Sequence, residues 1–262
     1  MSPSSIGAET IRLHRRGGGP PLVLLHCLGV DHRLWEIAAA DLDRDFTVMS
    51  LDFPGHGAAP LPQRPYGIED LSQMLVELFD REAIGRAHLG GISLGGLVAQ
   101  HFAAAHPERV DRLILMDTTP RYTEEMRQMW AVRARQARAE GVASLLGNLL
   151  PVWFTPDFVA SDPAAVRYVR NCFENDSGEG YALACEALGA ADLRALAPRI
   201  AAPTLIVCGD QESAAFQDAA RWLESNIPNA RLAWLSPARH ASVLERPEEF
   251  TRLARAFLAV SA

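Results

Sequence analysis

Short apolar runs alternate with longer amphipathic segments along most of the chain. The apolar runs span residues 22–26, 46–51, 87–92, 113–116, 204–208 and 232–235. Most of these runs are continuously apolar, which is typical of parallel strands whose two faces are both covered. Segments with a helical hydrophobic period lie between them, at residues 69–82, 94–105, 214–225 and 247–259. This alternation predicts an α/β fold with a doubly wound, mostly parallel sheet.

One stretch breaks the alternation, between residues 120 and 198. Its pattern is mostly helical and holds no convincing strand, with interruptions at Gly141, Pro151, Pro156, Pro163 and residues 176–180. In sheets of this kind, ligands bind at the carboxyl edge of the strands. We therefore expect residues 120–198 to form a helical cap over that edge, and residues 1–119 and 199–262 to form the core.

The composition is that of an ordinary globular chain and argues against several classes of function. The 262 residues are 48% hydrophobic and 22% charged, unlike disordered or fibrous chains. The formal net charge of −7 argues against a nucleic-acid partner. All 25 basic residues are arginine, so neither a Schiff-base lysine nor a phosphate-binding P-loop lysine is available.

The sequence favours a cytoplasmic protein without a membrane partner. Its N-terminal residues lack the pattern of a signal peptide. The longest segment without Asp, Glu or Arg, residues 87–107, contains Gly, Ser, His and Pro, which suits a buried turn and helix better than a membrane span. The four cysteines, Cys27, Cys172, Cys185 and Cys208, form no C-x-x-C pair, so we expect free, buried thiols in a reducing compartment.

A serine motif lies between a predicted strand and a predicted helix. Residues 91–95 read Gly-Ile-Ser-Leu-Gly and match G-x-S-x-G. The run 87–92 precedes the motif and the helical segment 94–105 follows it, which is the strand–turn–helix context of a nucleophile elbow. Ser93 is therefore the predicted nucleophile. Because a serine hydroxyl is weakly nucleophilic at neutral pH, it requires an adjacent base.

The candidate base and acids follow the serine in the chain order expected of such hydrolases. His240 lies between the last predicted strand and the last predicted helix. The loop after residues 204–208 offers two carboxylates, Asp210 and Glu212, and Asp117 follows an earlier strand as a third candidate. One of them should orient the histidine and stabilise its cation. His56, in a Pro-Gly-His-Gly turn, is interpreted as structural.

The oxyanion of the tetrahedral intermediate requires preorganised N–H donors. The backbone amide of Leu94, directly after Ser93, is one candidate, and that of Leu28, in the loop after the first strong strand, is the other. No pair of histidines has the H-x-x-x-H spacing of a helical zinc site, so no metal is expected.

Together these residues resemble the α/β-hydrolase family over almost the whole chain, and more closely the 3-oxoadipate enol-lactonases of aromatic catabolism. The similar core segments are residues 24–35, 55–57, 91–96, 106–115 and 203–207. The predicted cap, which is normally variable, also has similar residues at 153–156, 179–182, 185 and 191–193. The resemblance implies a serine hydrolase of the β-ketoadipate pathway that opens an enol-lactone through an acyl-Ser93 intermediate without a cofactor.

The resemblance also points to Glu212, because relatives carry the triad acid three residues after a glycine. The chain departs from the family pattern at three places. Relatives usually have Asp where Glu212 stands, often followed by Thr and Pro where this chain has residues 213–216, Ser-Ala-Ala-Phe. Val152 stands where Arg is common. These departures flank the triad and the acyl pocket, so they bear on the substrate more than on the chemistry.

The implied substrate carries a carboxylate, which the net negative charge repels at long range, so local cations must recognise it. Arginine matches a carboxylate through two parallel hydrogen bonds. Arg33, in the loop beside Leu28, and Arg133, in the predicted cap, are the candidate contacts. Trp130 and Trp153 are the candidates for the apolar side of the pocket.

Three other functions would use the same residues. A carboxylesterase or a different lactonase would share the triad and differ in substrate. A metal-free perhydrolase of the haloperoxidase type would also share it. A ligand-sensing protein of this fold would bind a small molecule and turn it over slowly. The expected partner of the preferred hydrolase is a small lactone or ester, and the sequence carries no signal for an oligomeric state.

Overall fold

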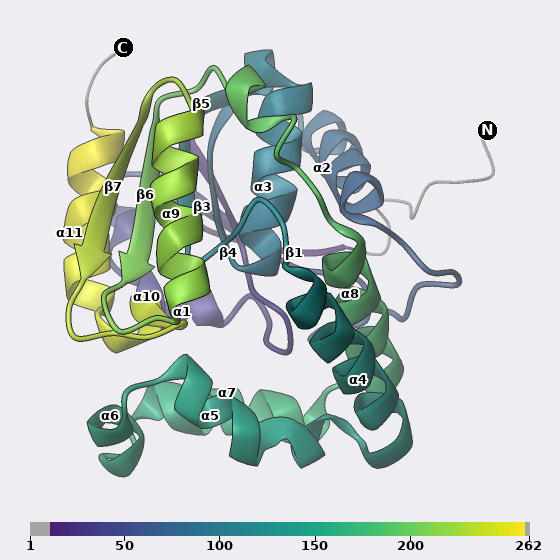
Figure 1. Ribbon diagram of the computed structural model, residues 1–262. Helices are drawn as coiled ribbons and strands as arrows, with labels where there is room; N and C mark the ends of the chain where they lie inside the picture. The colour runs from purple at the N-terminus through teal and green to yellow at the C-terminus, as the bar shows by residue number, and fades with distance from the viewer. Residues whose placement is uncertain (1–10, 260–262) are drawn as a thin grey trace.

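Seven strands form one sheet in the computed structural model, which describes residues 11–259 (Figure 1). In chain order they are β1 (Arg12–Gly17), β2 (Pro21–Leu25), β3 (Thr47–Asp52), β4 (Ala87–Ile92), β5 (Val110–Met116), β6 (Thr204–Gly209) and β7 (Ala230–Leu235). Their spatial order is β1-β3-β2-β4-β5-β6-β7. Every neighbouring pair is parallel except β1 and β3. The predicted mostly parallel α/β sheet is confirmed.

Strand β1 is the one strand that the hydrophobic pattern does not predict. Its sequence, Arg-Leu-His-Arg-Arg-Gly, contains a single aliphatic residue, and all six positions are exposed or half-buried. It pairs antiparallel with β3 at the edge of the sheet, from Arg12 opposite Asp52 to Gly17 opposite Thr47. An edge strand can carry charged side chains because solvent reaches it and because such charges discourage edge-to-edge pairing.

Helices cover both faces of the sheet. The helices α2 (Ile68–Arg81), α3 (Leu94–Ala105) and α9 (Ala214–Asn226) lie on one face, and α1 (Leu34–Ala38) packs against α11 (Pro247–Leu258) on the other (Figure 1). All six residues of β4 are buried. Coverage from both sides explains why the central strands are continuously apolar. The remaining core elements are η2 (Leu42–Arg44), η3 (Pro107–Arg109), η5 (Ala197–Arg199) and α10 (Ser242–Glu245).

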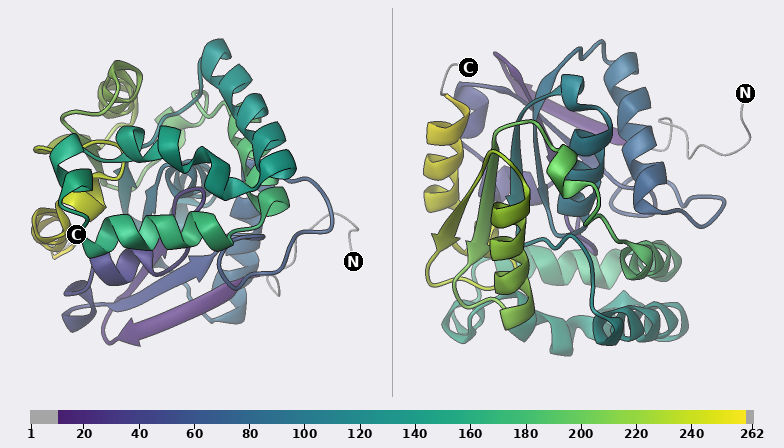
Figure 2. Two further views of the ribbon diagram at one scale, coloured as in Figure 1. Left: turned by 90° about the horizontal axis from the view of Figure 1, so that it is seen from below. Right: turned by 45° about the horizontal axis from the view of Figure 1, so that its top comes forward.

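The helices of residues 120–198 lie across the carboxyl edge of the sheet, below the tips of β6 and β7 (Figures 1 and 2). They are α4 (Glu124–Glu140), η4 (Val142–Leu145), α5 (Leu146–Trp153), α6 (Pro156–Ala160), α7 (Ala164–Asn175) and α8 (Gly178–Ala190). Helix α4 packs along α8. Four of the five expected interruptions coincide with helix ends, but the one at Pro151 is wrong, because Pro151 lies inside α5.

The division into a core and a cap stays a prediction, and residues 1–10 and 260–262 of the predicted core lie outside the described residues. Hydrogen bonds tie the two parts together beside His240. The Glu245 carboxylate accepts from the backbone N–H (2.9 Å) and the hydroxyl (2.7 Å) of Thr155. The backbone N–H of Ala241 donates to the carbonyl of Trp153 at 2.9 Å. These bonds hold the loop that carries His240 against α5 and α6.

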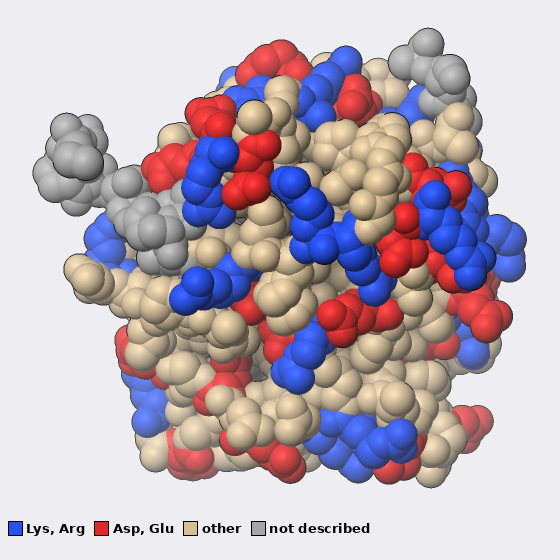
Figure 3. All heavy atoms as spheres, turned by 180° about the vertical axis from the view of Figure 1, so that it is seen from behind, with Lys and Arg blue, Asp and Glu red and all other residues tan. Residues whose placement is uncertain are grey.

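The described surface is polar and mixed in charge. On the face shown in Figure 3, basic and acidic side chains are interspersed rather than separated into patches. Many arginines pair with a carboxylate, as in Arg255 with Asp45 at 2.7 Å. Between residues 11 and 259, no helix is long and apolar enough to cross a membrane. All four cysteines are buried and free, which confirms the prediction made for them.

Candidate active site

Ser93 lies at the tight turn between β4 and α3. Its backbone is in the left-handed region, with φ 52° and ψ −111°, which non-glycine residues rarely adopt. The Ser93 N–H donates to the carbonyl of Met116 at 2.9 Å. A Cβ atom added to Gly91 would overlap the Gly95 carbonyl, and one added to Gly95 would overlap the Leu25 carbonyl. The two glycines of the motif thus allow the turn that presents the serine side chain.

His240 bridges Ser93 and Glu212. The His240 Nε2 atom lies 3.2 Å from Ser93 Oγ, and its Nδ1 atom lies 2.6 Å from Glu212 Oε2. A carboxylate only accepts hydrogen bonds, so the proton of the neutral imidazole is on Nδ1, and Nε2 accepts from the serine hydroxyl. All three side chains are buried. The three side chains are thus hydrogen-bonded in the order of a Ser-His-acid triad, with Ser93 as nucleophile, His240 as base and Glu212 as acid.

The two alternative carboxylates have other partners. Asp210 accepts from the Ser236 hydroxyl (2.6 Å) and from the Ala238 N–H (3.1 Å). Asp117 accepts from the Gly209 N–H (3.0 Å) and from the Ser242 hydroxyl (2.5 Å). Both stabilise the loops around His240 without contacting it. Among the carboxylates of residues 11–259, Glu212 alone hydrogen-bonds to the imidazole.

The charges of the site interact strongly. Burial by itself lowers the pKa of His240. The charge of Glu212 and its hydrogen bond to the imidazole raise this pKa by more than burial lowers it, so the net pKa lies above 6.5. Burial also raises the pKa of the Asp117 carboxyl, to about 7. The Phe216 ring meets the His240 ring edge-on, with centroids 4.9 Å apart. Such packing excludes water, which strengthens the electrostatic interaction between His240 and Glu212.

The two predicted oxyanion donors flank Ser93. Leu94 is the first residue of α3, and the first amides of a helix have no acceptor within it. They also lie at the positive end of the helix dipole. Leu28 lines the same cavity as Ser93, from the loop after β2. Both positions are compatible with the predicted role, which stays a prediction.

A cavity of about 570 Å³ opens above the serine, between the sheet edge and the cap helices. Trp130, Arg133 and Trp153 line it, as the sequence analysis expected. The sequence analysis missed Met126, Met129 and Tyr181, which also line it, whereas Phe216 comes from the loop that it placed beside the acyl pocket. Met126, Met129, Trp130 and Arg133 have i, i+3, i+4, i+7 spacing and share one face of α4. That periodicity was the available signal for the two methionines.

Arg33 lies outside the cavity that contains Ser93, which corrects the expected contact between Arg33 and the substrate. Its Nη2 atom lies 2.6 Å from Asp31 Oδ2, and its guanidinium lies over the Tyr168 ring, 5.5 Å from the centroid. Arg33 lines a separate surface pocket that does not include Ser93. The local carboxylate of Asp31, two residues away, holds the side chain there, because a bidentate charge-assisted pair fixes its geometry.

Known proteins are similar to this chain in both sequence and fold. The model of the alpha/beta hydrolase family matches residues 22–253. A 3-oxoadipate enol-lactonase 2 from Acinetobacter baylyi is 32% identical over 239 residues, which cover 91% of this chain and 88% of that protein. A pimeloyl-[acyl-carrier protein] methyl ester esterase from Chromobacterium violaceum is 32% identical over 244 residues, covering 90% of this chain and 93% of that protein.

A solved structure agrees with this assignment. The enol-lactonase from Burkholderia xenovorans LB400 superposes with a TM-score of 0.91 at 36% identity, over 95% of this chain and 96% of that one. The resemblance drawn from the sequence, to the family and more closely to the 3-oxoadipate enol-lactonases, is confirmed. The family model matches residues 22–253, and the strand order and the strained turn at Ser93 agree with that match. This chain therefore belongs to the alpha/beta hydrolase family.

Proposed function

We propose that this protein is a serine hydrolase that opens a small, carboxylate-bearing lactone, with 3-oxoadipate enol-lactone as the substrate and 3-oxoadipate as the product. One observation carries the proposal. The hydrogen-bonded chain Ser93–His240–Glu212 opens into a largely apolar cavity that contains the guanidinium-bearing residue Arg133. The similarity to two enol-lactonases supports this choice of substrate.

In the proposed mechanism, Ser93 Oγ attacks the lactone carbonyl while His240 Nε2 accepts the hydroxyl proton. The backbone amides of Leu28 and Leu94 donate to the oxyanion, and Glu212 stabilises the imidazolium. Collapse of the intermediate breaks the ring C–O bond and releases an enolate oxygen, which His240 protonates. Water then gives a proton to His240 and attacks the acyl-enzyme, and collapse of this second intermediate releases the acid and returns the proton to Ser93. The enol formed on ring opening tautomerises to the ketone, which gives the keto acid.

Arg133 supports recognition of an anion. Its guanidinium lies over the Trp130 ring, 4.9 Å from the centroid. Unlike most arginines of the described chain, it forms no ion pair with any carboxylate of residues 11–259. The Trp130 Nε1–H is buried and also has no acceptor among those residues. A half-buried guanidinium without a carboxylate partner, beside a largely apolar cavity, suits a ligand carboxylate.

A second candidate is a carboxylesterase that accepts a longer acyl chain. Two methionines of α4, Met126 and Met129, line the cavity, and methionine adapts well to flexible apolar ligands. The relative from Chromobacterium violaceum is named as a methyl ester esterase. In this alternative, the triad acts as described above and the leaving group is an alcohol.

The deciding experiment compares two substrates. Freshly prepared 3-oxoadipate enol-lactone is followed by loss of its ultraviolet absorbance, beside a short nitrophenyl ester. Rapid lactone turnover with weak ester cleavage is expected. Efficient ester cleavage without lactone turnover would assign the carboxylesterase. A single burst of product without further turnover on either substrate would instead indicate a ligand-sensing protein.

Replacing Arg133 with alanine should weaken binding of the carboxylate-bearing lactone. Loss of a charge-assisted pair costs about 2 kcal/mol or more, which is about a thirtyfold rise in KM. The neutral nitrophenyl ester makes no such pair, so its KM should change less than about threefold. Steady-state kinetics on both substrates measures this difference.

Arg135→Ala is the matched control, because Arg135 is an exposed arginine of the same helix and does not line the cavity. It should leave both KM values unchanged. Equal losses on the lactone and on the neutral ester in Arg133→Ala would rule out carboxylate recognition by this residue.

The pH dependence should reflect the raised pKa of His240. The base must be neutral to accept the serine proton, so kcat/KM should fall with decreasing pH through an apparent pKa above 6.5. Glu212 is what raises this pKa, so Glu212→Gln should move the acidic limb to lower pH. Profiles of kcat/KM from about pH 5 to about pH 8 test this. An acidic limb that stays in place in Glu212→Gln would contradict the coupling.

A further inference from the structure

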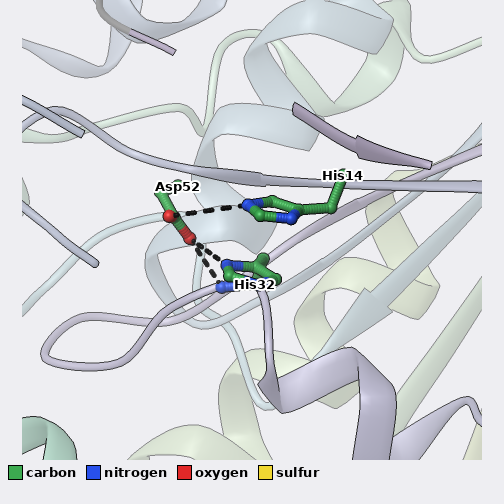
Figure 4. Close-up of side chains that lie close together, drawn as sticks. All are labelled: His14, His32 and Asp52. Atoms are coloured by element: carbon green, nitrogen blue, oxygen red, sulfur yellow. Dashed lines mark hydrogen bonds and ion pairs between the residues drawn. The ribbon is translucent and has the colours of Figure 1, made fainter. Parts of the chain in front are cut away.

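Two histidines and an aspartate meet at the edge of the sheet (Figure 4), and none of them lines the cavity that contains Ser93. His14 comes from β1, His32 from the loop after β2, and Asp52 from the end of β3. The His32 Nδ1 atom lies 2.8 Å from Asp52 Oδ1, and His14 Nε2 lies 4.0 Å from Asp52 Oδ2. The two imidazoles are stacked, with centroids 3.3 Å apart and 5° between their planes. Each ring presents a nitrogen to the same carboxylate (Figure 4).

The hydrogen bonds to the Asp52 carboxylate leave one lone-pair direction of Oδ2 without a donor. Oδ1 accepts from both the backbone N–H and the ring of His32, at 2.8 Å each. Oδ2 accepts from the Ala58 N–H at 3.0 Å. A carboxylate oxygen has two lone-pair directions, so Oδ2 retains one. That oxygen faces His14 Nε2 across 4.0 Å, too far for a hydrogen bond but close to the ~3.4 Å that separates two ligand atoms on a tetrahedral ion with bonds of ~2.1 Å.

The cluster is partly accessible, and the arginines beside it are paired with carboxylates. The His14 side chain is 43% exposed, whereas that of Asp52 is fully buried. His14 lines a surface cavity of about 380 Å³ together with Glu36, a carboxylate one helical turn after His32. The arginines of that cavity are already paired, Arg15 with Glu82 and Arg16 with Asp43. A cation can therefore reach the cluster without meeting an unpaired positive charge there.

We propose that His14, His32 and Asp52 bind one divalent transition-metal ion of the zinc class. Two imidazoles and a carboxylate are ligands that Zn²⁺ and Ni²⁺ accept, whereas Mg²⁺ and Ca²⁺ prefer oxygen alone. The ion takes the place of the proton that His32 shares with Asp52, and that proton goes to solvent. One imidazole turns out of the parallel stack, because the two ring lone pairs must converge on the ion. His14 has the exposure to do so.

The bound ion has a structural role. None of its three ligands lines the cavity of Ser93. It joins the edge strand β1 to the loop after β2, which also carries Leu28. That loop is also held by the helices of residues 120–198, where the Tyr168 hydroxyl donates to the Asp31 carbonyl at 3.0 Å. The ion therefore adds a cross-link between three segments that are distant in sequence, and stabilises the native state by mass action.

Calorimetric titration of the chelator-treated protein with ZnCl₂ tests the proposal. One ion should bind per chain, and the midpoint of thermal unfolding should rise with the Zn²⁺ concentration. His14→Ala and His14→Gln should each lower the affinity at least about tenfold. Since His14 is on an exposed edge strand, both variants should keep the fold, which circular dichroism and the hydrolase activity without metal will show.

Two control variants separate this cluster from other histidines. His106→Ala, at a half-buried position after α3, should bind Zn²⁺ as the wild type does. His240→Ala removes the imidazole beside Ser93 and should also leave the affinity unchanged. The proposal is overturned if no saturable binding of one ion occurs, if His14→Ala binds as tightly as the wild type, or if the affinity is lost in His240→Ala instead.

Discussion

Ser93→Ala should lower kcat by about 10⁴- to 10⁶-fold on any ester or lactone that the wild type hydrolyses. Alanine removes the atom that forms the acyl-enzyme and leaves the oxyanion donors and the cavity in place. Residual catalysis should come from these parts alone. The Ser93 hydroxyl contacts His240 and Tyr122, and alanine differs from serine by one oxygen atom, so the fold should be retained.

Steady-state kinetics and mass spectrometry together check this result. The wild type should acquire the mass of an acyl group during rapid-quench turnover, and Ser93→Ala should not. KM should change little, since the cavity is intact. Substantial turnover by Ser93→Ala would show that another group, or water activated directly by His240, attacks the substrate, and the proposed covalent mechanism would be wrong.

Glu212→Gln should have the second largest effect, with kcat lowered by about 10³- to 10⁴-fold. The Glu212 carboxylate holds the Nδ1–H of His240 at 2.6 Å and stabilises the imidazolium that forms when Ser93 loses its proton. An amide has no charge for that cation, and it can donate to Nδ1 and so select the wrong tautomer. Both effects act on the transition state, so kcat should fall more than KM changes.

Asp210→Asn is the matched control in the same loop. Its carboxylate bonds to Ser236 and to the Ala238 N–H rather than to His240, so kcat should fall less than about tenfold, with a loss of stability of about 1 kcal/mol. The reverse order, with Asp210→Asn inactive and Glu212→Gln active, would show that the loop rearranges and that Asp210 is the triad acid.

The core elements could be predicted from the sequence because their signals are local. The helix 94–105 begins and ends as expected, and the six expected strands are present within a few residues of their predicted bounds. Five of the six are almost entirely buried, so their own apolar side chains predict them, whereas β7 is mostly half-buried at the other edge of the sheet. Strand β1 could not be predicted in this way, because an edge strand needs few apolar residues and its pairing with β3 is non-local.

Charged side chains were harder to place than apolar ones. The sequence offered Arg33 and Arg133 equally as contacts for a substrate carboxylate. The structure places Arg133 at the cavity and Arg33 in an ion pair with Asp31. A long, flexible side chain can reach several carboxylates, and the fold determines which of these lies within hydrogen-bond distance.

The sequence by itself determined the family, the α/β class of the core and the turn that carries Ser93, because glycines, small residues and hydrophobic period act on the backbone within a few residues. The residues alone left Asp117, Asp210 and Glu212 open and only the family resemblance pointed to Glu212, whereas the tertiary structure shows that Glu212 contacts His240. It also brought His14 and His32 together, although they stand on separate segments without any motif spacing. Such pairings depend on strand order and loop path, which place side chains from distant segments within a few ångströms of each other.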